Sequence, residues 1–411
     1  MAGASLMTPS GMLAGLQRLR VRFGTSSYFQ WVLALFLVGF LVIPSTRHHR
    51  DFYYFLVLLP FLLVLQRSEW RALFASHTVR LTSLLLAYMV LTLSWSAEVT
   101  ADDVYDHFRH ALLMLSLVLI IAQVTQLNPR WLEDVFPLFV LAAVIVTAYS
   151  TFQFYQDNTF PYARLQNQMG IRDNPIGGSV PLVLIGLTCT AVSLADRNLM
   201  RRGLALFGAF SALVFLVLAQ SRSLLLGFVI GLVILLVYLR AWRLLASAVG
   251  VGLLGLLALE FSEVFRGFLE RADSYRFAIW SDALRQIGEK PWLGHGLNTP
   301  MLFDEEHAHT DSAHNMWLTV YLQGGLPGFL LYAGVMLTSL VWLLRSARSE
   351  GTYLFVALLG FTLVFTALNV HGLVGRFSPH LVTSVWLCIG LAAGVELRLR
   401  ETHCRLESTS S

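Results

Sequence analysis

Residues 203–239 read GLALFGAFSALVFLVLAQSRSLLLGFVIGLVILLVYL, which is two apolar runs separated by the polar tetrapeptide Gln220-Ser-Arg-Ser223. A helix needs about 20 mostly apolar residues to cross the hydrocarbon of a bilayer, and each run approaches that length. The stretch therefore predicts two membrane-spanning helices joined by a short polar turn. Arg222 lies in this turn.

The same pattern recurs along the rest of the chain. The 411 residues are 56% hydrophobic and 13% charged, whereas about a quarter of the residues in soluble domains are charged. We predict twelve transmembrane helices, near 28–45, 52–66, 81–96, 110–126, 135–153, 177–195, 203–220, 223–239, 244–262, 326–344, 352–370 and 379–397. The predicted fold is an all-α polytopic membrane protein with a single membrane domain over residues 1–411.

The arginines predict the orientation. With both termini in the cytoplasm, seventeen arginines lie on the inner side and the remaining twelve basic residues lie outside, mostly in longer loops. Because these arginines are spread through short loops, the basic pI near 9 predicts a membrane protein and no nucleic-acid partner.

The outer segment 263–325, between the ninth and tenth spans, is too long for a simple turn. Within it, Tyr275–Ile287 predicts an amphipathic surface helix that stops at Gly288. Pro291–Asn298 predicts a glycine-rich turn. The apolar face of the helix is predicted to carry Phe277, Trp280, Ala283, Leu284 and Ile287, and the opposite face Asp282, Arg285, Gln286 and Glu289.

Two outer arginines are candidates for binding an anion. Arg222 is predicted at the depth of lipid phosphates, where the planar guanidinium suits bidentate phosphate binding. Arg276 is predicted on the apolar side of the surface helix, where a cation needs an anionic partner. The alternatives are a snorkelling arginine at a helix end for Arg222 and an ion pair within the protein for Arg276.

Histidines gather in the same segment, namely His295, His307, His309 and His314. We expect His314 in the first turn of a helix that ends at Gly324-Gly325. There the positive end of the helix dipole keeps the imidazole neutral and able to accept a proton near pH 7. The alternative is a surface or capping histidine.

His307 and His309 stand among carboxylates, which are ligand types that suit zinc or manganese. Loops rich in Glu, Asp and His are often simply solvated, so we predict no metal and no cofactor. The spans contain almost no acids or bases, and the nearest candidate, Glu260, lies at a helix end. This disfavours an ion-coupled transporter, which needs such groups inside the membrane.

A set of motifs in the outer segment resembles a known family. The set consists of Arg276 and Trp280, Pro291-Trp-Leu-Gly-His-Gly296, His314-Asn315, and Tyr321-Leu-Gln-Gly-Gly-Leu-Pro-Gly328. It resembles the outer-loop signature of O-antigen ligases and O-antigen polymerases. The twelve-span layout, with a long loop between spans nine and ten, is also similar, so the likeness covers most of the chain.

The resemblance implies a glycosyltransferase with a helical fold like that of the C-type glycosyltransferases. Such ligases transfer O-antigen polysaccharide from undecaprenyl pyrophosphate to a sugar hydroxyl of lipid A-core, at the periplasmic face of the bacterial inner membrane and without a metal. It implies that His314 is the essential histidine and that Arg222 and Arg276 are the essential arginines. Arg172 is a further pyrophosphate-binding candidate, and Asn315 and His295 are secondary candidates.

The chemistry is consistent with these roles. A pyrophosphate leaving group gains negative charge as the anomeric bond breaks, so fixed cations stabilise the transition state more than the ground state. His314 would take the proton of the acceptor hydroxyl on the opposite side of the sugar, which predicts inversion at the anomeric carbon.

Two other functions stay open. One is an O-antigen polymerase of the same superfamily, which joins lipid-linked repeat units. The other is a lipid or polysaccharide flippase, a non-enzyme that needs a large polar cavity, although these spans offer few residues to line one.

Overall fold

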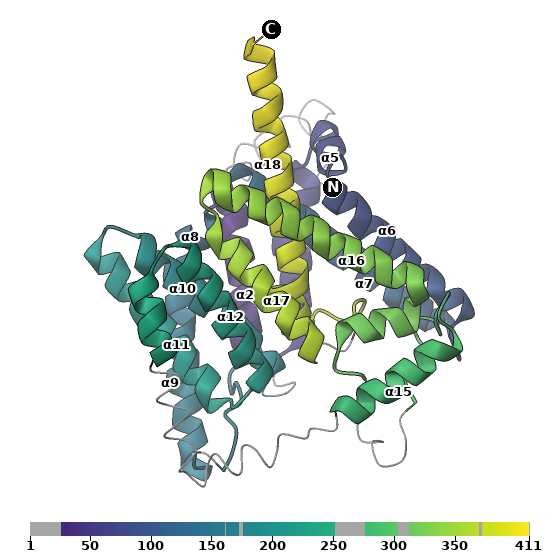
Figure 1. Cartoon of the computed structure of the whole chain (residues 1–411), viewed down its shortest axis with the longest axis horizontal. Helices are drawn as coiled ribbons and strands as arrows, with labels where there is room; N and C mark the ends of the chain where they lie inside the picture. Colours follow the sequence, from purple (N-terminus) through teal and green to yellow (C-terminus); the bar gives the residue numbers. More distant parts are fainter. Residues whose placement is uncertain are drawn as a thin grey trace, which may run out of the picture.

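The computed structural model describes residues 26–160, 162–171, 176–250, 276–302, 312–369 and 372–410. Every regular element in these ranges is helical (Figure 1). The first half contains α2 (Ser26–Val42), α3 (Thr46–Phe52), η1 (Tyr53–Leu58), α4 (Leu59–Val64), α5 (Arg67–Leu73), α6 (His77–Leu91), η2 (Thr92–Trp95), α7 (Ala101–Leu127), α8 (Trp131–Asp134) and α9 (Phe136–Asp157). The second half contains η3 (Gly177–Ser179), α10 (Val180–Ala195), α11 (Leu199–Leu218), α12 (Arg222–Tyr238), α15 (Arg276–Glu289), α16 (Met316–Glu350), α17 (Tyr353–Asn369), η5 (Leu381–Trp386) and α18 (Leu387–Ser410).

The prediction of an all-α, multi-pass architecture is confirmed for the described residues. Seven helices are long and apolar enough to cross a membrane, or up to eight if the helix pair Thr46–Val64 and Arg67–Leu73, bent by 108°, counts as one span. Three shorter apolar helices, α2, α12 and α17, accompany them. The predicted span 244–262 lies mostly outside the described residues, and the total of twelve stays a prediction.

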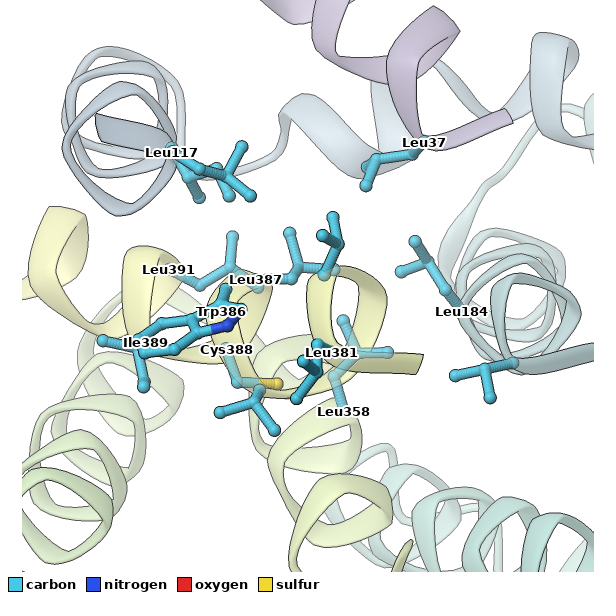
Figure 2. Packing of buried hydrophobic residues seen from close by; sticks show 14 of the residues in the cluster. Leu37, Leu117, Leu184, Leu358, Leu381, Trp386, Leu387, Cys388, Ile389 and Leu391 are labelled. Carbon is cyan, nitrogen blue, oxygen red and sulfur yellow. The ribbon is translucent and has the colours of Figure 1, made fainter. Parts of the chain in front are cut away.

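Helix α18 forms the centre of the bundle. In the most apolar stretch of Leu381–Cys404, which includes η5, 94% of the residues are buried, compared with 33% in the corresponding stretches of α11 and α16. Figure 2 shows apolar side chains from four other helices, Leu37, Leu117, Leu184 and Leu358, converging on η5 and the start of α18. The remaining spans therefore pack around α18, and several leave apolar faces to the outside.

Glu396 is a buried carboxylate in α18 that the sequence analysis overlooked. Its side chain is fully buried and accepts hydrogen bonds from the hydroxyls of Ser76 and Thr78 and from the backbone amides of His77 and Thr78. Arg400, one turn further along α18, forms an ion pair with it at 2.7 Å. Since free amides at a helix start need acceptors, Glu396 fixes the first turn of α6 to α18.

The functional candidates lie at the opposite end of the bundle from the protruding end of α18 (Figure 1). Helix α15 lies there, beside the first turns of α16. Gly325 breaks α16 with φ 60° and ψ −164°, so Met316–Glu350 is two helical segments joined by a kink. The kink lies where the sequence predicted one helix to end at Gly324-Gly325 and the next span to begin near residue 326.

Candidate active site

Helix α15 packs on α16, and its buried residues are Ile279, Asp282, Ala283, Gln286 and Ile287. Of the residues predicted on its apolar face, Ala283 and Ile287 are buried, whereas Phe277 and Leu284 are 80% and 56% exposed. Asp282 and Gln286, which were predicted on the polar face, are buried. The helix itself is confirmed, and it runs to Glu289, one residue beyond the expected stop.

Gln286 is buried because backbone groups satisfy its amide. Its Nε2 donates to the carbonyls of Asp282 and Leu302, and its Oε1 accepts from the Leu302 amide at 3.1 Å. His295 Nε2 donates to the Gln286 carbonyl at 2.7 Å. These bonds attach the turn that follows α15 to the helix, so His295, a secondary candidate, has a structural partner here.

The two glycine-containing motifs interlock through their backbones. The amide of His295 donates to the Leu322 carbonyl at 2.8 Å, and the amide of Leu326 donates to the Pro291 carbonyl at 2.9 Å. Gly294 and Gly325 both have positive φ, and a Cβ on Gly294 would stand 2.5 Å from the Gly325 nitrogen. The predicted turn at Pro291–Asn298 is confirmed. It requires glycine at Gly294 and Gly325, where the backbones of the two segments are in direct contact.

His314 lies just before α16. The prediction that it occupies the first helical turn was wrong, because Asn315 is the N-cap and accepts from the amides of Trp317 and Leu318. His314 has φ 47°, a left-handed conformation that is uncommon outside glycine and that orients the chain into the cap. It is half-buried, next to the fully buried Ala313.

Trp280 connects α15 to the backbone beside His314. Its indole Nε1 donates to the Ala313 carbonyl at 3.0 Å. Ile279, Ala283 and Ala313 form a small apolar cluster under this contact. The helix that begins with Arg276 thus fixes the segment that carries His314.

Arg222 begins α12 at the same end of the bundle. The turn before it is shaped by Gln220, which has φ 49° and donates to the Ala163 carbonyl at 2.7 Å. On its other side, Asn369 at the end of α17 donates to the Ser223 hydroxyl at 2.9 Å, and both side chains are buried. The Ser221 hydroxyl is buried with no hydrogen-bond partner in the described part of the chain.

Arg276 and Arg222 are electrostatically coupled. Burial of the Arg276 guanidinium and the positive charge of Arg222 both hold the pKa of Arg276 below its ordinary value. Two guanidiniums close enough to repel each other, one of them half-buried, favour an anion between them. The electrostatic effect of Arg222 on Arg276 is consistent with the prediction that the two residues share one site, which stays a prediction.

Comparison with known proteins shows what the chain is similar to. Residues 207–333 match the family described as O-antigen ligase. The O-antigen ligase of Pseudomonas aeruginosa is 28% identical to this chain, in an alignment that covers 93% of this chain and 89% of the relative. The chain therefore contains a segment similar to the O-antigen ligase family and resembles one such ligase over most of its length. The family segment runs from α11 into α16 and contains Arg222, Arg276 and His314.

Some predicted site residues fall outside the described residues. Arg172 is one, although its neighbour Ile171 donates its amide to the Phe40 carbonyl at the end of α2. His307 and His309 are the others. Within the described ranges, no group of three or more His, Cys, Asp or Glu side chains could hold a metal ion.

Asn369 and Ser223 were not predicted as part of the candidate site. An asparagine at the end of an otherwise apolar helix was the available signal, because a buried amide needs a partner. The identity of that partner, 146 positions away in the chain, follows only from the packing of α17 against α12.

Proposed function

We propose that this protein transfers O-antigen polysaccharide from undecaprenyl pyrophosphate to a sugar hydroxyl of lipid A-core. The match of residues 207–333 to the O-antigen ligase family, and the similarity to the Pseudomonas aeruginosa ligase, support O-antigen ligation and hence a glycosyltransferase-type enzyme. Together with the apolar helices, this similarity also supports a multi-pass bacterial membrane protein. The proposal adds the inner membrane, cytoplasmic termini and a periplasmic active site.

One observation carries the mechanistic part of the proposal. Arg276 is the first residue of α15, and the charge of Arg222 acts on its guanidinium. Trp280 of the same helix donates a hydrogen bond to the carbonyl of Ala313, the residue before His314. One short helix therefore connects the two cations with the histidine. These are the groups that transfer from a diphosphate to a hydroxyl requires.

In the proposed reaction, Arg222 and Arg276 bind the pyrophosphate and stabilise the charge that develops on it as the anomeric bond breaks. His314 accepts the proton from the acceptor hydroxyl as that oxygen attacks the anomeric carbon from the opposite face, which gives inversion. The lipid diphosphate leaves with the electron pair of the broken bond. The two arginines supply the positive charge, so the proposed reaction is metal-independent.

The test uses the purified full-length protein in detergent with lipid-linked O-antigen, isolated lipid A-core and EDTA. We expect lipid A-core joined to polysaccharide in EDTA, and a loss of about 10²- to 10⁴-fold in rate for His314→Ala. His48→Ala, a change at an exposed histidine, is the matched control. A fully active His314→Ala protein, or transfer that needs added zinc, contradicts the proposed mechanism.

The same assay separates the other two functions. A polymerase would lengthen the lipid-linked donor and leave lipid A-core unmodified. A flippase would form no covalent product. Either result with the wild-type protein would overturn the ligase proposal.

A further inference from the structure

A second group of arginines lies on three segments outside the O-antigen ligase match. Arg50 is on α3, Arg109 is on α7, and Arg376 is in the segment between α17 and η5. The charges of Arg109 and Arg376 both act on His110, which is buried in α7. Residues from α7 and from the segment between α17 and η5 therefore lie close to each other.

An aromatic contact brings Arg50 to the same place. Phe377, next to Arg376, packs edge-on against Tyr53, with ring centroids 4.8 Å apart. Arg50 lies three residues before Tyr53 on a continuous helix, and residues three apart share a helix face. Arg50 and Arg376 thus flank the Phe377–Tyr53 contact.

Two of these guanidiniums have unused hydrogen-bond capacity. The Nε atoms of Arg50 and Arg109 are buried and have no hydrogen-bond partner within the described ranges. Asp106 accepts from Arg109 at 2.9 Å, but only through a terminal nitrogen. A guanidinium has five N–H donors in a fixed plane. Because the Nε atoms are enclosed, the terminal nitrogens of the partly exposed Arg50 and Arg109 side chains are the donors that can reach the oxygen atoms of a ligand.

This group is distinct from the Arg222–Arg276 pair but lies near it. Among the described residues, the charge that lowers the pKa of Arg276 is that of Arg222, and the second group does not contribute to it. Asn369 is hydrogen-bonded beside Arg222, and Arg376 is seven residues further along the chain. Seven residues span at most about 25 Å, so Arg376 lies within that distance of Asn369.

We propose that Arg50, Arg109 and Arg376 bind a phosphate group of the acceptor glycolipid, which positions its sugar hydroxyl toward His314. This inference rests on the proposed function, which already assigns the diphosphate of the donor to Arg222 and Arg276. A separate set of guanidiniums suits a phosphate on the acceptor glycolipid, because a phosphate accepts bidentate hydrogen bonds from the planar guanidinium.

The test measures the KM for two acceptors, isolated lipid A-core and the same lipid after chemical removal of its phosphates. Arg376 is exposed, so Arg376→Gln leaves folding intact. We expect this variant to raise the KM for the phosphorylated acceptor about tenfold, the effect of losing one charged hydrogen bond. Its kcat, its KM for the donor and its KM for the dephosphorylated acceptor stay at wild-type values.

Two further variants complete the test. Arg376→Lys keeps the charge and restores part of the affinity, whereas Arg345→Gln, at an arginine that stacks on Trp342, serves as the matched control and changes nothing. An equal rise in KM for both acceptors, or no rise, overturns the inference while leaving transfer, and hence the proposed function, intact.

Binding without transfer provides the second readout. Native mass spectrometry of the full chain with lipid A-core, and no donor, should show weaker binding for Arg376→Gln. Phosphatidylglycerol should not displace the glycolipid from the wild-type protein. Equal competition by phosphatidylglycerol would show that the arginines bind ordinary phospholipid and would overturn the assignment. Absence of any transfer by the wild-type protein, in contrast, contradicts the proposed function itself.

Discussion

The indole Nε1 of Trp280 donates a hydrogen bond to the carbonyl of Ala313 at 3.0 Å. Trp280 is one turn after Arg276, and Ala313 directly precedes His314. A single side chain therefore fixes the distance between the helix that presents a cation and the segment that presents the proposed base. Such positioning matters because small displacements of reacting groups reduce rates strongly.

Trp280→Phe keeps most of the aromatic packing and removes the donor. We expect the transfer rate to fall roughly two- to tenfold, which corresponds to the net free energy of one neutral hydrogen bond. Steady-state kinetics of the purified variant measure this. Trp292→Phe is the matched control because Trp292 is 70% exposed. Equal rates for both variants would show that the indole bond does not position His314.

Arg222→Gln and Arg276→Gln should each lower kcat/KM for transfer by about 10²- to 10³-fold, the usual effect of removing one group that stabilises a developing oxyanion. Because the two guanidiniums are coupled, the double variant should lose less than the product of the single losses. Kinetics of the three variants test this. Strict additivity would mean that the arginines act at separate sites.

Gly294→Ala should destabilise the protein by at least about 1–3 kcal/mol, because φ of 71° strains an L-residue and its Cβ would collide with the backbone around Gly325. Thermal unfolding in detergent measures the loss. Gly334→Ala is the control: no atom lies within 4 Å of its added Cβ, and alanine favours the helix. A Gly294→Ala protein as stable as the control would contradict the interlocked arrangement of the two motifs.

Glu396→Gln should also lower the stability, by about 1–3 kcal/mol or more, because Arg400 loses its ion-pair partner and an amide NH2 replaces an acceptor of buried donors. Since Glu396 lies at the end of the bundle away from α15, the folded variant should keep its kcat. Glu289→Gln, on the exposed side of α15, is the control. A large fall in kcat with unchanged stability would argue against a structural role for Glu396.

The apolar runs were sufficient to predict the class of fold and most of its helices. A continuous apolar segment of this length has few alternatives to a buried or membrane-spanning helix. The interlocking glycines at Gly294 and Gly325 were predictable as turn and helix-end signals, but their mutual contact depends on backbone packing between segments. The assignment of Gln286 to the polar face of α15 did not reveal its burial, which is possible because the Leu302 backbone satisfies its amide. Periodicity alone does not reveal such a partner.

The sequence supplied candidate residues for the site but not their arrangement. The motif resemblance singled out Arg222, Arg276 and His314, and the coupling of the two arginines is consistent with it. The sequence predicted His314 inside the first turn of α16, whereas His314 precedes the N-cap, Asn315. The error arose because Asp311, Ser312 and Asn315 are all of types that favour the N-cap. Glu396 was overlooked because a carboxylate near the end of an apolar run resembles an interfacial residue.

The central claim is that Arg222 and Arg276 bind one diphosphate within reach of His314. A cryo-electron microscopy structure of the wild-type protein with a short-chain prenyl diphosphate tests it most directly. We predict that both guanidiniums contact the same diphosphate and that the imidazole of His314 faces its terminal phosphate, to which the sugar of the donor would be bonded. A diphosphate bound away from either arginine, or an imidazole directed away from it, would contradict the account.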